Sequence, residues 1–66
     1  MIEFEVNDMT CGHCASLISK AVRSVDPGAQ VEIDLTNKRV RIQGNTEVDE
    51  FADAIRQAGY SPVDAG

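Results

Sequence analysis

Two hydrophobic periodicities alternate along this chain, and their order constrains the fold more than any other feature of the sequence. Apolar residues alternate with polar ones over residues 2–6, 31–35 and 40–42, which is the pattern of a half-buried strand. Over residues 14–25 and 48–58 they recur instead every three or four positions, as on one face of an amphipathic helix. The apolar positions of the two expected helices are Cys14, Leu17, Ile18, Ala21, Val22 and Val25 in the first, and Val48, Phe51, Ala52, Ile55 and Ala58 in the second.

Turn-forming residues mark the ends of these elements. Asp26-Pro27-Gly28 ends the first helix, since proline cannot continue a helix and glycine takes the turn. Thr36-Asn37-Lys38 joins the second and third strands as a hairpin. Thr46 and Asp49 resemble a capping box at the start of the second helix, and Gly59 is a natural stop at its end.

A last strand is expected at residues 60–63, where Pro62 would confine it to an edge of the sheet or cut it short. The predicted order is therefore strand, helix, strand, strand, helix, strand, in one domain that spans residues 1–66. A four-stranded antiparallel sheet with both helices on one face buries all the apolar faces together. The sequence thus predicts an α+β fold, the ferredoxin-like βαββαβ sandwich.

Charge and hydropathy exclude two classes of partner. The net charge of −5 argues against nucleic acid, which requires a basic patch, and no apolar run is long enough for membrane insertion. The N-terminal residues carry no signal-peptide pattern, so we expect a cytoplasmic protein, where free thiols survive. Lys20 and Arg23 make the first helix basic, and residues 47–53 carry four acids and no base. Such blocks can orient a partner protein or form ordinary solvated surface.

The two cysteines are the residues with distinctive chemistry. Cys11 is expected in the loop after the first strand, and Cys14 in the first turn of the first helix. A disulfide between them would close a very small loop and constrain the unfolded chain little. Their spacing lets both sulfurs converge on one ion, and the helix N-terminus stabilises thiolates.

Two thiolates select a soft metal ion such as Cu(I) or Zn(II). Zinc usually takes four ligands, whereas Cu(I) accepts two, so the ligand count favours copper. Zinc is the alternative metal, and Asp8 or His13 would then complete the site. Neither residue is favoured as a ligand, and we expect a solvated His13.

The sequence Cys11-Gly12-His13-Cys14 also matches the redox motif of protein disulfide isomerases. In that motif the first cysteine attacks a disulfide. Thioredoxin-like domains run to about 100 residues and usually place a tryptophan before the motif, but this chain has 66 residues and no tryptophan. A thiol-disulfide oxidoreductase is therefore the less favoured alternative.

The segment Met9-Thr10-Cys11-x-x-Cys14, with Gly59-Tyr60 after the second helix, resembles the heavy-metal-associated domain family. That family includes bacterial copper chaperones and the N-terminal domains of metal-transporting P-type ATPases. The resemblance covers essentially the whole chain. It implies that Cys11 and Cys14 bind Cu(I), that Met9 packs inward beneath the loop, and that Tyr60 lies near the site. Asp8 is a departure, because the family usually has glycine before the methionine.

The resemblance implies a metallochaperone and not an enzyme, so no catalytic residue is predicted. Such a protein passes Cu(I) by thiolate exchange to a partner, here expected to be a copper-transporting P-type ATPase or its metal-binding domain. We expect a monomer without metal, and a copper-bridged dimer stays open.

Overall fold

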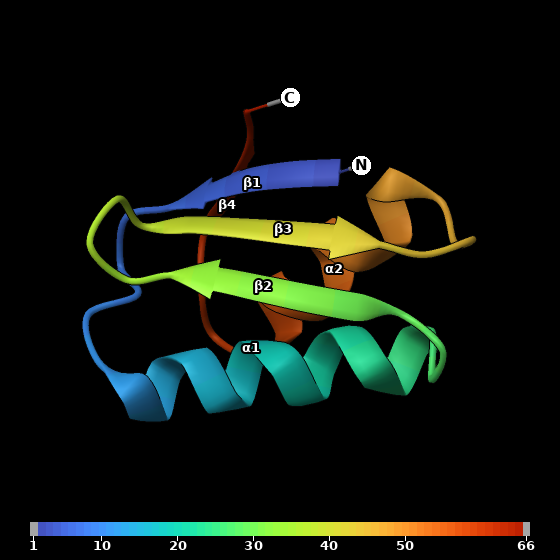
Figure 1. The fold of residues 1–66 in the computed structure, drawn as a ribbon, viewed down its shortest axis with the longest axis horizontal. Coiled ribbons are helices and arrows are strands. Elements are labelled where there is room, and N and C mark those ends of the chain that lie inside the picture. The colour runs from blue at the N-terminus through green and yellow to red at the C-terminus, as the bar shows by residue number, and fades with distance from the viewer. Residues whose placement is uncertain (1, 66) are drawn as a thin grey trace.

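The structure is a computed structural model that describes residues 2–65, and its elements follow the predicted order. They are β1 (Ile2–Val6), α1 (Gly12–Val25), β2 (Gln30–Asp34), β3 (Arg39–Gln43), α2 (Val48–Gln57) and β4 (Pro62–Asp64). The strands form one antiparallel sheet in the order β2-β3-β1-β4. Both helices pack on the same face of that sheet (Figure 1). The ferredoxin-like prediction is confirmed.

One hydrophobic core lies between the sheet and the helices. The largest fully buried side chains come from β1, β3, both helices and the loop after β1; they are Phe4, Val6, Met9, Ile18, Val22, Val40, Ile42, Phe51 and Ile55. Each fully buried side chain of this kind contributes roughly 1.5–3 kcal/mol relative to its exposed state. Because Met9 belongs to this core, the loop before α1 is anchored to the most stable part of the molecule.

Three details differ from the sequence prediction. Leu17 and Leu35 were expected on buried faces but are 37% and 39% exposed, since Leu17 lies at the border of the apolar stripe and β2 ends before Leu35. The last strand begins at Pro62, two residues later than expected, on the edge of the sheet. A proline at the first residue of an edge strand removes no essential hydrogen bond.

The capping box predicted from Thr46 and Asp49 is wrong. The residue that precedes α2 is Glu47, and it makes no side-chain cap. Thr46 lies one residue before the N-cap position, so it is not placed to form the expected box with Asp49. Asp49 still lies in the first turn of α2, where its negative charge interacts favourably with the helix dipole.

Asp26, directly after α1, connects two loops through hydrogen bonds to its carboxylate. Its carboxylate accepts the backbone N–H of Gly28 at 3.1 Å and that of Asn45 at 3.0 Å, which joins the turn before β2 to the loop before α2. The contact with Asn45 is the main cause that holds the pKa of Asp26 below its ordinary value. A Cβ at Gly44 would lie only 2.6 Å from Asp26 Oδ2, so glycine permits this close approach.

The sheet face opposite the helices carries acidic and basic side chains that form ion pairs between neighbouring strands. Arg39 pairs with Glu3 at 3.1 Å, and Arg41 pairs with Glu3 at 3.5 Å and with Glu32 at 2.9 Å. These ion pairs are partly exposed and each adds little stability. They do leave this face without the basic patch that nucleic acid would need. None of the helices in residues 2–65 has the length and apolar character required to cross a membrane.

Candidate metal centre

The loop between β1 and α1, here called the metal loop (residues 7–11), is shaped by a tight turn and a buried anchor. The backbone N–H of Met9 donates to the carbonyl of Val6 at 3.1 Å, which reverses the chain directly after β1. The Met9 side chain is fully buried in the core, whereas Thr10 and Cys11 are exposed. A flexible thioether fills such a space well. The buried methionine therefore fixes the point from which the cysteine segment emerges.

A contact from the β2–β3 turn braces the start of the metal loop. The Lys38 ammonium donates to the carbonyl of Asn7 at 3.1 Å, and the backbone N–H of Val6 donates to the carbonyl of Lys38 at 2.8 Å. Lys38 adopts a left-handed backbone conformation with φ of 57°, which is uncommon for a residue with a side chain. The hairpin turn and the metal loop are thus held together although they are distant in sequence.

The two cysteine sulfurs converge at the start of α1. Cys11 occupies the N-cap position of α1 without making a side-chain cap, and Cys14 lies in the first turn of the helix. Their Sγ atoms are 3.4 Å apart, within hydrogen-bond distance, and both thiols are free. Because a metal–thiolate bond is about 2.3 Å long, sulfurs at this separation can share one ion. Cys11 is exposed and Cys14 is half-buried, so the site opens towards solvent on the Cys11 side.

The cysteine sulfurs lie at the N-terminus of α1, which is the positive end of the helix dipole. No side chain caps the helix, and its first turn contains no acidic residue. The first backbone N–H groups of a helix lack partners within it and carry the positive end of the helix dipole. An anionic bis-thiolate is therefore favoured at this position.

Tyr60 contributes most to the lowered pKa of Cys14. The Tyr60 hydroxyl donates to Cys14 Sγ, and this hydrogen bond is the largest cause that lowers the pKa of Cys14 to about 6. The backbone of Thr10 and the Cys11 thiol act in the same direction. The same bond to Cys14 is the main cause that raises the pKa of Tyr60 to about 12, with added effects of burial and of the charges on both cysteines and Asp8.

The end of α2 places Tyr60 at the cysteines. Gly59 adopts φ of 100°, its N–H donates to the carbonyl of Arg56 at 3.0 Å, and the N–H of Tyr60 donates to the carbonyl of Ile55 at 3.2 Å. This pair of bonds is the Schellman motif, in which a left-handed glycine turns the chain away from the helix axis. The ring of Tyr60 then packs against the core, partly buried.

Residues 3–61 match the sequence profile of the Heavy-metal-associated domain family. The chain belongs to this family. The domain is 34% identical to the copper chaperone CopZ of Staphylococcus aureus over 61 residues, which cover 88% of this chain and 90% of CopZ.

Two solved structures extend the similarity of this heavy-metal-associated domain to three dimensions. The copper chaperone Atx1 from Synechocystis PCC6803, in its Cu2 form, superimposes with a TM-score of 0.92 at 33% identity and covers 96% of this chain and 100% of Atx1. The N-terminal domain of PacS from the same organism has a TM-score of 0.86 at 27% identity and covers 98% of this chain and 96% of the PacS domain.

The other two candidate ligands, Asp8 and His13, do not complete a metal-binding group with the cysteines. The Asp8 carboxylate accepts the N–H of Ser61 at 3.2 Å, and His13 is exposed. Within residues 2–65, no three His, Cys, Asp or Glu side chains form a group that could hold a metal ion. The structure thus brings Cys11, Cys14 and Tyr60 together, and leaves Asp8 and His13 outside that group.

Sequence reasoning missed Lys38 and Ser61, which both hold the metal loop. The turn position of Lys38 was predicted, but no local pattern indicates that its ammonium reaches a carbonyl 31 residues away. Ser61 contributes only its backbone N–H, so its residue type carries no signal.

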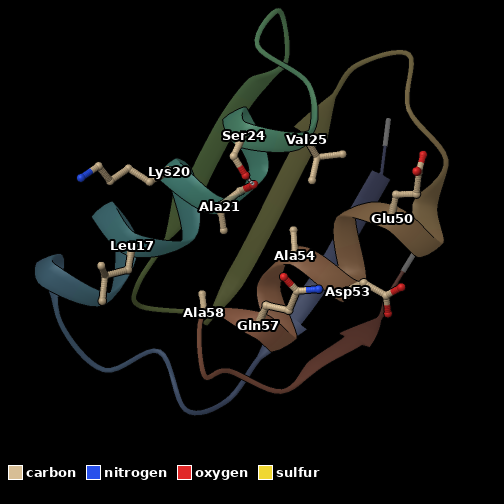
Figure 2. A pocket seen from close by; sticks show the side chains of 10 residues that line it. All are labelled: Leu17, Lys20, Ala21, Ser24, Val25, Glu50, Asp53, Ala54, Gln57 and Ala58. Carbon is tan, nitrogen blue, oxygen red and sulfur yellow. Dashed lines mark hydrogen bonds between the residues drawn. The ribbon is translucent and has the colours of Figure 1, made fainter.

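A groove lies between α1 and α2 (Figure 2). Leu17 and Lys20 lie on the α1 side, and Glu50 and Asp53 lie on the α2 side. Lys20 also lines a second hollow between α1 and β2, together with Arg23. Asp53 is paired with Arg56 at 2.9 Å. Among the residues that line the groove, the positive charge is that of Lys20 on α1.

Proposed function

We propose that this domain is a copper metallochaperone that binds one Cu(I) ion on Cys11 and Cys14 and passes it to a partner protein. The observation that carries the proposal is the pair of sulfurs 3.4 Å apart at an uncapped helix N-terminus, one of them with its pKa lowered to about 6. The names of CopZ and Atx1, to which the chain is similar, support copper as the cargo.

The number of available ligands favours Cu(I) over Zn(II). Zinc sites are usually four-coordinate, whereas the described residues supply two thiolates and no third side chain in a common group. A bis-thiolate copper site carries one net negative charge, which the positive end of α1 stabilises. Zinc would have to take its further ligands from water or from another protein.

The family of the chain weighs against a thiol-disulfide oxidoreductase. Residues 3–61 match the Heavy-metal-associated domain family, and the relatives CopZ and Atx1 are named copper chaperones. The 66-residue chain is also shorter than a thioredoxin-like domain of about 100 residues.

Transfer requires no chemical turnover, so we infer a carrier and not an enzyme. Two-coordinate Cu(I) leaves room for a third thiolate, and a partner cysteine can enter before one of the domain's own sulfurs leaves. Exposed Cys11 offers the side of approach, while half-buried Cys14 holds the ion during the exchange. Free copper is thereby never released into water.

We further propose that the partner is a copper-transporting P-type ATPase or its metal-binding domain. The domain would act as a monomer and would bind this partner in the cytoplasm. The similarity to the PacS N-terminal domain supports a partner of the same fold. Lys20, in the second half of α1, and Arg23, in its last turn, are exposed and would steer an acidic surface of that partner.

Anaerobic Cu(I) titration of the reduced domain against a competing chelator tests the ligand assignment. We expect one tightly held ion per monomer, and we expect Cys11→Ser together with Cys14→Ser to abolish it. His13→Ala is the matched control, with an expected change in affinity of less than about tenfold. Tight binding that survives the double cysteine change would refute the proposal.

A further inference from the structure

Asp8 links two loops that are far apart in the sequence. Its carboxylate belongs to the metal loop, and its partner, the N–H of Ser61 at 3.2 Å, belongs to the connection between α2 and β4. The two residues are 53 positions apart, so this bond forms only in the folded chain. It is therefore a tertiary contact made by a residue that the sequence suggested only as a metal ligand.

The contact lies directly beside Tyr60. On the N-terminal side, the N–H of Tyr60 is held by the carbonyl of Ile55 through the Schellman motif. On the C-terminal side, the next N–H along the chain, that of Ser61, is held by Asp8. The backbone of Tyr60 is thus fixed from both sides, by a main-chain carbonyl of α2 and by a side chain of the metal loop.

We propose that Asp8 is a positioning residue, which holds the α2–β4 connection against the metal loop and thereby keeps the Tyr60 hydroxyl at Cys14 Sγ. The inference extends the proposed copper function but concerns the metal-free domain. The hydrogen bond from the Ser61 N–H to the Asp8 carboxylate, next to Tyr60 in the chain, is the geometric observation behind the proposal.

The test compares Asp8→Ala, which removes the acceptor, with Asp8→Asn, which keeps an acceptor oxygen and loses the charge. Amide hydrogen exchange at Ser61 reports the hydrogen bond itself. Acrylamide quenching reports the exposure of Tyr60, which is the sole tyrosine in a chain without tryptophan and so the only strong intrinsic fluorophore. Asp49→Ala, the loss of another exposed acid, is the matched control.

We expect Asp8→Ala to accelerate exchange at Ser61 about tenfold and to increase quenching of Tyr60. Asp8→Asn and Asp49→Ala should leave both close to wild type, with thermal unfolding confirming that every variant is folded. Unchanged exchange and quenching in Asp8→Ala would overturn the inference, as would an Asp8→Asn variant that behaves like Asp8→Ala. All these measurements use metal-free protein. The positioning role of Asp8 can therefore be refuted while the copper titration supports the proposed function, and the proposed function can be refuted while the role of Asp8 is supported.

Discussion

Removal of the Tyr60 hydroxyl tests the central electrostatic feature of the site. Tyr60→Phe keeps the ring that packs against the core and deletes only the donor to Cys14. The hydrogen bond from Tyr60 is the largest of several causes that lower the pKa of Cys14 from 9.0 to about 6. The backbone of Thr10 and the Cys11 thiol remain in the variant, so only part of the shift is lost. We expect the pKa of Cys14 to rise by roughly one unit.

The sign of the resulting pH effect follows directly. A thiol with a raised pKa holds its proton to higher pH, so Tyr60→Phe has less Cys14 thiolate than wild type at every pH near neutrality. At pH 6 the thiolate fraction should fall from about one half to about one tenth. Because Cu(I) must displace that proton, the apparent copper affinity should fall as well, and the deficit should disappear once the pH exceeds both pKa values.

The assay follows the 13Cβ chemical shift of Cys14 against pH in reduced, metal-free protein, which separates this thiol from Cys11. His13→Ala removes the exposed neighbour and should leave the midpoint in place. The reciprocal measurement uses Cys14→Ser, in which the pKa of Tyr60 should fall from about 12 towards 10.0 because the thiolate no longer accepts its hydrogen bond. A Tyr60→Phe midpoint equal to that of wild type would refute the assignment of Tyr60 as the donor.

Four further predictions concern stability and docking. Gly44→Ala should lower the free energy of unfolding by about 1–3 kcal/mol in urea denaturation, because the added Cβ meets Asp26 Oδ2 at 2.6 Å. Gly59→Ala meets no atom within 4 Å but must adopt φ of 100°, so it should cost about 1–2 kcal/mol in the same assay. Asp26→Asn should be less stable than wild type at neutral pH, and the difference should vanish as the pH falls through the lowered pKa of Asp26, where the wild-type carboxylate is itself protonated. Lys20→Glu with Arg23→Glu should slow stopped-flow copper transfer to an acidic partner at low salt, with unchanged copper affinity, and the effect should shrink at higher ionic strength; equal rates at low salt would show that this surface does not steer docking.

The parts of the molecule that the sequence predicts are those encoded locally. The order of elements follows from apolar spacing within each segment, and the cysteine pair is found because both members belong to one short segment at a helix start. The end of α2 was predicted for the same reason, since Gly59 carries its own conformational preference.

The parts that sequence reasoning could not supply depend on contacts between distant segments. The sequence predicts a cap at Thr46, whereas α2 begins one residue later, with Glu47 at the N-cap position. Leu17 follows the helical period, yet it lies at the border of the apolar stripe and is 37% exposed. The proximity of Tyr60 to the cysteines was implied by the family resemblance, and no spacing in the chain would have indicated it.

Both ends of α1 are held by exposed hydrogen bonds, and the N-terminal end has a buried methionine in addition. At the C-terminal end, the Asp26 carboxylate ties backbone groups of two loops around a glycine that leaves no room for a side chain. At the N-terminal end, Met9 is the buried residue of the metal loop, and the bonds that Lys38 and Ser61 donate to this loop are exposed. Exposed hydrogen bonds open locally at low free-energy cost, whereas a buried anchor does not. The metal loop can therefore adjust Cys11 to an incoming thiolate while Met9 keeps its base in place, so exchange with a partner does not require the fold to open.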